Sequence, residues 1–304
     1  MRSPMTCDPG GIRTPLTASS KVEETGEVAA LRRWVAEQRA RGRRIGFVPT
    51  MGYLHEGHLA LVDAARQRAA AVVMSIFVNP LQFAPTEDLS RYPRDLPRDR
   101  SLAAARGVEF LFVPDADVMY PPGSETRVVP GPAADRWEGE FRPGHFSGVL
   151  TVVAKLFHLV QPDVACFGRK DIQQVTLVGA MARDLDWPIE IVVVPTIREP
   201  DGLALSSRNV YLTADDRAQA LGLSRALREA DRRWRAGERS AAQIEGAVRE
   251  VLRMHPGLVA DYIAVCEPVA MTPVADAAAG TIVALAARVG STRLIDNIVL
   301  GEEQ

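Results

Sequence analysis

The fold prediction starts from one stretch, Ile45-Gly46-Phe47-Val48-Pro49-Thr50-Met51-Gly52-Tyr53-Leu54-His55-Glu56-Gly57-His58-Leu59. Its first four residues form a short apolar run typical of a strand, and an apolar pattern at helical spacing begins at Leu59. His55 and His58 are three residues apart, so they share one face at the start of this helix. Backbone N–H groups without helical partners and the positive end of the helix dipole lie at the same place. The stretch therefore predicts a strand–loop–helix unit that binds phosphate.

Strand-like and helical segments alternate through the first two thirds of the chain. The strand-like runs are short, apolar and rich in β-branched residues, as expected of strands covered on both faces. Their alternation with helices predicts a Rossmann-like, doubly wound parallel sheet, which binds ligands at the carboxyl ends of its strands. The predicted strands are 45–48, 71–78, 108–113, 164–167 and 189–194, and the predicted helices are 28–41, 59–68, 98–106, 146–159 and 172–183.

The pattern changes after about residue 197. Two alanine- and arginine-rich helical stretches, 214–236 and 241–254, precede three strand-like runs at 259–265, 281–289 and 292–296. Gly290-Ser291 predicts a tight turn that joins the last two runs as a hairpin. We therefore expect an extension without fixed structure over residues 1–24, a Rossmann-like nucleotide-binding domain over 25–196, and a smaller C-terminal α+β domain over 197–304.

Composition excludes several classes of protein. The formal charge of −2 over 304 residues argues against a nucleic-acid partner held by bulk electrostatics. The three cysteines form no CxxC pair and are too few for a disulfide framework, which favours a reduced cytoplasmic setting. No apolar run approaches the ~20 residues of a membrane span, and the first twenty residues lack the apolar core of a secretory signal. We expect neither a membrane nor a nucleic acid as partner.

Further polar segments follow the predicted strands or lie in turns. Asn79-Pro80-Leu81-Gln82 ends the second strand, and Gly168-Arg169-Lys170-Asp171 follows the fourth. Phe141–Gly148 is a turn-rich approach to a helix, and Asp201–Asn209 follows the fifth strand. Because the carboxyl ends of parallel strands meet at one sheet edge, we expect these segments to converge on the His55 stretch.

The ordered set of motifs resembles the pantothenate synthetase family, within the nucleotidyltransferase superfamily that carries an H-x-G-H signature. The resemblance covers about residues 28–300 and implies ATP-dependent condensation of pantoate with β-alanine. In this family the reaction passes through an enzyme-bound pantoyl adenylate and releases AMP and pyrophosphate. The motifs are P-T-M-G-x-L-H-E-G-H from Pro49, F-V-N-P-x-Q-F from Phe77, Y-P-R from Tyr92, H-F-x-G from His145, K-D-x-Q-Q from Lys170 and D-G-L-A-x-S-S-R-N from Asp201.

The resemblance also implies roles for individual residues. His58 is the proton donor with His55 beside it, and Lys170 and Arg208 bind the triphosphate. Mg²⁺ accompanies ATP, no cluster of carboxylates indicates a dedicated metal site, and the family suggests a homodimer. Gln82 and Gln174 bind pantoate, and Gln82 also meets β-alanine. The residues implied at the ATP site are Met51, Gly52, Tyr53, Leu54, His55, Glu56, Gly57, His58, Gly168, Arg169, Lys170, Asp171, Ile197, Leu205, Ser206, Ser207 and Arg208.

Residue chemistry gives some of these positions a specific use. Gly57 leaves room for a flat ring or a ribose against bare backbone. The carboxylate of Asp171, beside Gly168, is suited to two adjacent ribose hydroxyls. Ile197 would offer backbone to the adenine. Ser206 and Ser207 would add hydroxyl donors to the phosphates.

Simpler roles stay open for several residues. Lys170 and Asp171 alone would be a solvated ion pair, Ser206-Ser207 a turn or helix cap, and His145 either a cap or a site residue. Arg169 stands where family members typically have glutamate, and Leu205 where they have methionine. Two other functions are open: a related nucleotidyltransferase acting on another small acceptor, and a nucleotide-binding protein without turnover. Contact of Gln82 and Gln174 with an acid substrate would favour the pantoate reaction.

Overall fold

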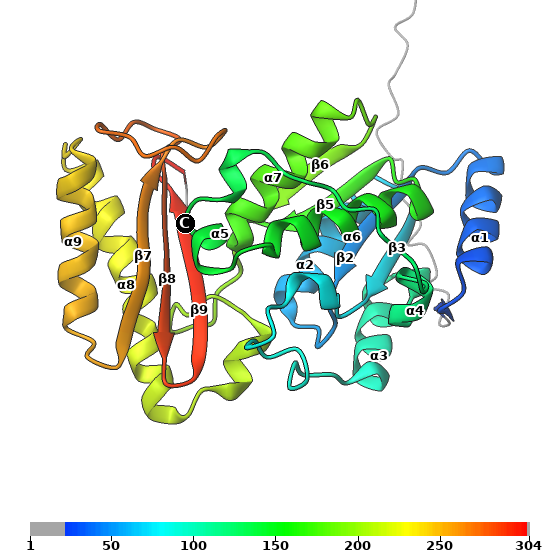
Figure 1. Cartoon of the computed structure of the whole chain (residues 1–304), viewed down its shortest axis with the longest axis horizontal. Helices are drawn as coiled ribbons and strands as arrows, with labels where there is room; N and C mark the ends of the chain where they lie inside the picture. Colours follow the sequence, from blue (N-terminus) through cyan, green and yellow to red (C-terminus); the bar gives the residue numbers. More distant parts are fainter. Residues whose placement is uncertain (1–21, 303–304) are drawn as a thin grey trace, which may run out of the picture.

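Two sheets organise the protein, and the computed structural model describes residues 22–302. The parallel-sheet unit (residues 23–194) contains a six-stranded sheet, and the C-terminal unit (residues 214–299) contains a three-stranded antiparallel sheet that lies beside it (Figure 1). The parallel strands are β1 (Glu23–Thr25), β2 (Ile45–Thr50), β3 (Ala71–Ile76), β4 (Phe110–Phe112), β5 (Val164–Gly168) and β6 (Glu190–Val194).

The order of the parallel strands creates a switch point at the middle of the sheet. The strands lie in the order β1-β4-β3-β2-β5-β6, and every neighbouring pair is parallel. From β2 the chain moves outward to β3 and β4, returns to place β5 on the other side of β2, and continues to β6. The carboxyl ends of β2 and β5 therefore flank the crevice in which such sheets bind ligands.

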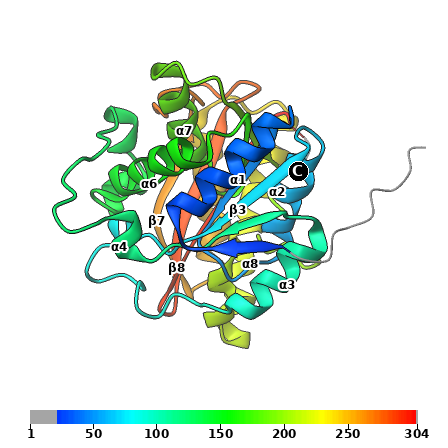
Figure 2. The same ribbon diagram turned by 90° about the vertical axis from the view of Figure 1, so that its right-hand side faces the viewer.

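Helices cover both faces of this sheet (Figure 2). Side chains that alternate along β2 enter different cores: Phe47 packs with α1, α6 and α7, whereas Val48 packs with α2 and α3. Burial on both faces explains why these strands read as continuous apolar runs. The helices are α1 (Val28–Ala40), α2 (Glu56–Arg66), α3 (Leu96–Arg106), α6 (His145–Val160) and α7 (Ile172–Asp184).

The C-terminal unit presents the two faces of its sheet to different neighbours. One face packs on α8 and α9, and the other, through Ala264, Ala284 and Val299, packs towards Trp137 and Ile172 of the parallel-sheet unit. The second contact joins the two units. The elements are α8 (Ala214–Arg235), α9 (Ala241–Arg253), β7 (Leu258–Cys266), β8 (Ile282–Val289) and β9 (Thr292–Val299).

Short elements fill the connections between these helices and strands. They are η1 (Pro80–Gln82), α4 (Ala116–Met119), η2 (Pro132–Ala134), α5 (Glu138–Phe141), η3 (Arg169–Asp171) and η4 (Ser207–Tyr211). Among the residues that the structure describes, every helix is too short or too polar to cross a membrane.

The predicted fold class is confirmed, including the hairpin, in which Val289 pairs with Thr292. The predicted extension over 1–24 is wrong at its end, because Glu23 and Glu24 belong to β1 and pair with β4. A polar three-residue strand has no apolar run from which to predict it. The rest of that extension, residues 1–21, lies outside the described residues. The domain boundary after residue 196 stays a prediction.

Candidate active site

A cavity of about 220 Å³ lies at the carboxyl ends of β2 and β5. It brings together segments that are more than 150 residues apart in the sequence, as expected for strand ends at a switch point. The predicted site residues that line it are Met51, His55, Gly57, His58, Gln82, Gly168, Lys170, Asp171, Gln174, Ile197, Leu205, Ser206, Ser207 and Arg208. Gly52, Tyr53, Leu54, Glu56 and Arg169 are absent from its lining.

The two histidines form the start of α2. His55 is the N-cap: its Nδ1 accepts a hydrogen bond from the backbone N–H of Gly57 at 3.1 Å, and Nδ1 of His58 accepts from the backbone N–H of His55 at 3.3 Å. A neutral imidazole that accepts at Nδ1 carries its proton at Nε2. Both rings therefore offer an Nε2–H donor, and their centroids are 4.0 Å apart.

Both histidines are held in the neutral form. Burial is the main cause that lowers the pKa of His55 to about 4, and the nearby Lys170 cation lowers it further. Burial, His55 and Lys170 together hold the pKa of His58 well below its ordinary value. At neutral pH each ring is a hydrogen-bond donor without a positive charge.

The structure gives a local reason for glycine at position 57, which differs from the expected room for a flat ring or a ribose. A Cβ there would lie 2.9 Å from Nδ1 of His55, so the bare backbone makes room for the capping imidazole. The predicted space for a flat ring is thus occupied by a ring of the protein itself. Gly57 still lines the cavity, next to Leu205.

Asp99 on α3 holds the turn before His55. Its two carboxylate oxygens each accept a hydrogen bond of 2.7 Å, one from the backbone N–H of Tyr53 and one from that of Leu54. Tyr53 has a positive φ of 51°, which is uncommon for a non-glycine residue and is fixed here by the buried carboxylate. These two predicted residues support the turn from outside the cavity, and Glu56 points away to pair with Arg106.

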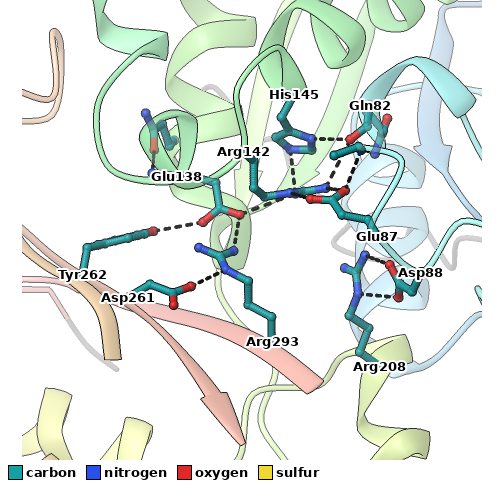
Figure 3. Close-up of polar contacts among 12 residues, drawn as sticks. Gln82, Glu87, Asp88, Glu138, Arg142, His145, Arg208, Asp261, Tyr262 and Arg293 are labelled. Atoms are coloured by element: carbon teal, nitrogen blue, oxygen red, sulfur yellow. Dashed lines mark hydrogen bonds and ion pairs between the residues drawn. The ribbon is translucent and has the colours of Figure 1, made fainter. Parts of the chain in front are cut away.

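Lys170 and Arg208 both bring positive charge to the cavity, but they differ in whether the charge is already paired with a carboxylate. Within residues 22–302 the Lys170 ammonium makes no hydrogen bond or ion pair, so its charge is available to a ligand. Arg208 instead donates to both carboxylate oxygens of Asp88, at 2.9 and 3.0 Å (Figure 3). Burial opposes ionisation of Asp88, but the Arg208 hydrogen bonds outweigh it and lower the pKa of the carboxyl. A phosphate that binds Arg208 must share it with this carboxylate or displace it.

Gln82 is fixed on η1 from several directions. Asn79, which is buried, donates to the Gln82 side-chain oxygen at 3.0 Å and to the backbone oxygen of Gly148 at 3.1 Å. The backbone oxygen of Gln82 accepts from Nδ1 of His145 at 2.9 Å and from Arg142 at 3.2 Å. His145 thus holds the turn that carries Gln82, and it also lines the cavity.

Arg142 connects this turn to the C-terminal unit (Figure 3). It donates to both carboxylate oxygens of Glu87 at 2.6 and 2.8 Å and to Glu138 at 3.4 Å. Glu138 in turn accepts from Arg293 of β9 at 2.5 Å, and Arg293 also donates to Asp261 of β7 at 2.6 Å. Burial and the Arg142 cation lower the pKa of His145 to about 4, which keeps this ring neutral as well.

The loop after β6 supplies the opposite wall. The backbone N–H of Leu205 donates to the oxygen of Ile197 at 2.9 Å, so the two strands of this loop are paired. Ser206 caps η4 by accepting from the backbone N–H of Arg208, and the Ser207 hydroxyl donates to the Tyr53 oxygen at 3.2 Å. The proton of Ser207 is thus already engaged, in contrast to the expected free donor.

Arg169 does not face the cavity. Its guanidinium pairs with Glu302 at 2.6 Å, near the C-terminal end of the described chain. Arg169 is thus engaged with a carboxylate and absent from the cavity lining, and its role in ATP binding stays a prediction. Among residues 22–302, no group of three His, Cys, Asp or Glu side chains could hold a metal ion.

Comparisons with known proteins agree with this geometry. The family model described as pantoate-beta-alanine ligase matches residues 23–299. The chain belongs to the pantoate–β-alanine ligase family. A pantothenate synthetase of Moorella thermoacetica is 53% identical over 273 residues, which are 90% of this chain and 96% of that protein.

Solved structures extend the similarity to three dimensions. A pantothenate synthetase of Thermus thermophilus has a TM-score of 0.87 at 50% identity and covers 91% of this chain and 99% of its own. A pantoate–β-alanine ligase of Francisella tularensis, crystallised with β-γ ATP and β-alanine, has a TM-score of 0.76 at 33% identity, with coverage of 92% and 98%. The pantoate–β-alanine ligase fold thus extends over nearly the whole chain.

Sequence reasoning missed residues of this ligase that act on other protein groups. Asp88 and Asp99 are single acids in polar segments, and no motif pairs them with Arg208 or with the Tyr53 turn. Asn79 stands inside the F-V-N-P-x-Q-F motif and Arg142 inside the turn-rich segment Phe141–Gly148, and these positions were the one signal available for them. Tyr92, from the Y-P-R motif, lines the cavity and lies under Arg208, with the guanidinium carbon 5.5 Å from the ring centroid.

Proposed function

We propose that this cavity binds ATP, pantoate and β-alanine and joins the two acids as pantothenate, with AMP and pyrophosphate as products. One observation carries the proposal: neutral imidazole donors, two side-chain amides and an ammonium without a partner among residues 22–302 come from three separate segments and line one cavity. This set matches a reaction in which a carboxylate attacks a phosphate and a polyanion leaves. Membership of the ligase family supports the same reaction.

In the first step, an oxygen of the pantoate carboxylate attacks the α-phosphorus of ATP, and pyrophosphate leaves. The Nε2–H groups of His55 and His58 donate to phosphate oxygens as negative charge accumulates, and the Lys170 ammonium stabilises it. The lowered pKa values favour the neutral form of both histidines before ATP binds, so we infer that they act first as hydrogen-bond donors through Nε2. Gln82 and Gln174 hold pantoate in line for the attack.

In the second step, the amine of β-alanine attacks the acyl carbon of the pantoyl adenylate and AMP leaves. The adenylate is labile in water, so the cavity must exclude it. Buried apolar side chains of α6, including Val149, Val152 and Val153, form one wall of the cavity and meet this need.

Magnesium fits the site as an ion carried by the nucleotide. The described residues contain no His, Cys, Asp and Glu group suited to a metal, so the phosphates themselves would be its main ligands. The bound ion would screen the negative charge of the phosphates. We also propose a homodimer, as the family resemblance suggests, and light scattering would measure the mass of the particle.

The test is AMP release by the purified protein with Mg-ATP, D-pantoate and β-alanine, omitting each substrate in turn. We expect sustained release only when all three are present. Equal release without pantoate would contradict the proposal and indicate a different acceptor.

A further inference from the structure

A side chain of the C-terminal unit holds the segment from which Lys170 projects. The Nδ2 group of Asn297 on β9 donates to the backbone oxygen of Arg169 at 2.9 Å and to that of Lys170 at 2.8 Å. Asn297 is only 3% exposed, and β9 packs directly on η3. Two consecutive carbonyls of the Lys170 turn are thus anchored from a strand more than 120 residues away.

The chemistry of the contact calls for a primary amide. One nitrogen with two N–H groups can donate to both carbonyls at once, whereas a hydroxyl has a single proton and a carboxylate has none. The Lys170 ammonium makes no hydrogen bond or ion pair within residues 22–302. The backbone of η3 is therefore the main constraint on where the Lys170 side chain starts. The position of the ammonium in the cavity therefore depends on this anchor.

The preceding residue acts on a second wall of the cavity. Asp296, also 3% exposed, accepts two hydrogen bonds from Arg198, at 2.7 and 3.0 Å. Arg198 follows Ile197, which lines the cavity. The backbone N–H of Asn297 donates to Asp296 at 2.8 Å, so the two anchors are coupled.

We propose that Asn297 is a positioning residue for nucleotide binding, which places the Lys170 ammonium where it meets the phosphates. The inference rests on the proposed function in one respect, that the cavity binds ATP. Asn297 itself is absent from the lining of the main cavity and acts through the backbone of η3.

The test compares Asn297→Ala with Ile298→Ala. Ile298 is the next residue of β9, is equally buried and packs in the core of the C-terminal unit. The Kd for ATP is measured by calorimetry without the other substrates, and the KM for pantoate and the Tm are recorded for each variant. We expect Asn297→Ala to raise the Kd for ATP about 10-fold, with the KM for pantoate changed less than about 2-fold. Ile298→Ala should lower the Tm at least as much and leave the Kd unchanged.

A double-mutant cycle with Lys170→Ala identifies the route of the effect. In the Lys170→Ala background, Asn297→Ala should weaken ATP binding no further. Should Asn297→Ala fail to fold, Asn297→Asp replaces it, since it keeps the shape but sets carboxylate oxygens against the two carbonyls, and we expect it also to raise the Kd for ATP.

Equal Kd values for ATP in the wild type and the Asn297 variants would overturn the inference. So would an equal rise in this Kd in Asn297→Ala and Ile298→Ala. The inference would also be overturned if the effects of Asn297→Ala and Lys170→Ala on the free energy of ATP binding were additive. If the wild type binds ATP but releases no AMP, the proposed function fails while the positioning role is still measured by the Kd. If the wild type does not bind ATP, both are overturned.

Discussion

The parallel-sheet unit and the C-terminal unit contribute to the site in different ways. Every residue that lines the main cavity comes from the chain up to Arg208, before the C-terminal unit begins. The C-terminal unit instead supplies Arg293, Asp296 and Asn297, whose hydrogen bonds end on groups that hold the cavity in place. We therefore propose that the parallel-sheet unit and the loop after it carry the reacting groups, whereas the C-terminal unit fixes their positions. Substitutions in the two regions should then affect turnover and stability to different extents.

The largest effect on turnover should come from His58 in the parallel-sheet unit. His58→Asn keeps an acceptor near the position of Nδ1 for the helix cap and loses the Nε2–H donor. We expect kcat to fall by roughly 10²–10³-fold, the range for loss of one donor to a transition state, with little change in Tm. His58→Gln, which returns a donor near the position of Nε2, is the matched comparison. Near-normal turnover in His58→Asn would remove this ring from the chemistry.

A change at the contact between the two units should lower stability more than turnover. Glu138 is 5% exposed and lies between Arg142 and Arg293, so Glu138→Gln leaves two partly buried cations short of negative charge. We expect the free energy of unfolding to fall by about 3 kcal/mol, as measured by urea denaturation. The KM for pantoate should rise only a few-fold, through Arg142 and Gln82. A loss of turnover as large as that of His58→Asn would contradict the proposal that the C-terminal unit acts on stability and positioning rather than on the reaction.

Gly148 tests how closely α6 and η1 must approach. A Cβ at this position would lie 2.2 Å from the backbone oxygen of Leu81, so Gly148→Ala must displace the turn that carries Gln82. We expect the KM for pantoate to rise about 10-fold, the result of losing roughly one good hydrogen bond. Gly179→Ala on α7, where a Cβ meets nothing within 4 Å, is the control and should leave kinetics unchanged. An unchanged KM in Gly148→Ala would show that Gln82 does not hold pantoate.

Stability should also depend on pH, because several buried histidines are held neutral in the folded protein. His55 and His145 have a pKa of about 4 in the folded protein, and that of His58 is also lowered. Below the ordinary value of about 6.5 the unfolded chain takes up protons that the folded protein does not, so stability is lost as the pH falls from about 6.5 towards 4.

Urea midpoints at pH 7.5 and 5.0 measure this effect at pH values where most carboxylates are still ionised. We expect a lower midpoint at pH 5.0, and a smaller difference in His145→Gln. The same midpoint at both pH values would mean that the rings are not held neutral by burial.

Much of the parallel-sheet unit could be predicted because its signals are local. The apolar run before Pro49 and the pair His55 and His58 indicate a strand, a loop and a helix within fifteen residues. Strand ends at a switch point then bring Gln82 and Lys170 to the same cavity without any knowledge of side-chain contacts.

The hydrogen bonds that hold the cavity residues in place could not be predicted, because they join residues that are distant in the sequence. Asn297 meets the Lys170 turn from 127 residues away, and Asp88 meets Arg208 from 120 residues away. A single acid or amide in a strand or loop has no local pattern that names its partner. The resemblance to a family likewise named most of the predicted residues that line the cavity, while the residues that hold them in place needed the structure.

Exchange of labelled pyrophosphate into ATP tests the central claim most directly, because it reports on adenylate formation alone. The assay contains the purified protein, Mg-ATP and D-pantoate without β-alanine, with the His58→Asn variant in parallel. We expect exchange that requires pantoate in the wild type and is reduced about 100-fold or more in His58→Asn. Exchange that does not depend on pantoate, or that persists in His58→Asn, would contradict the central claim.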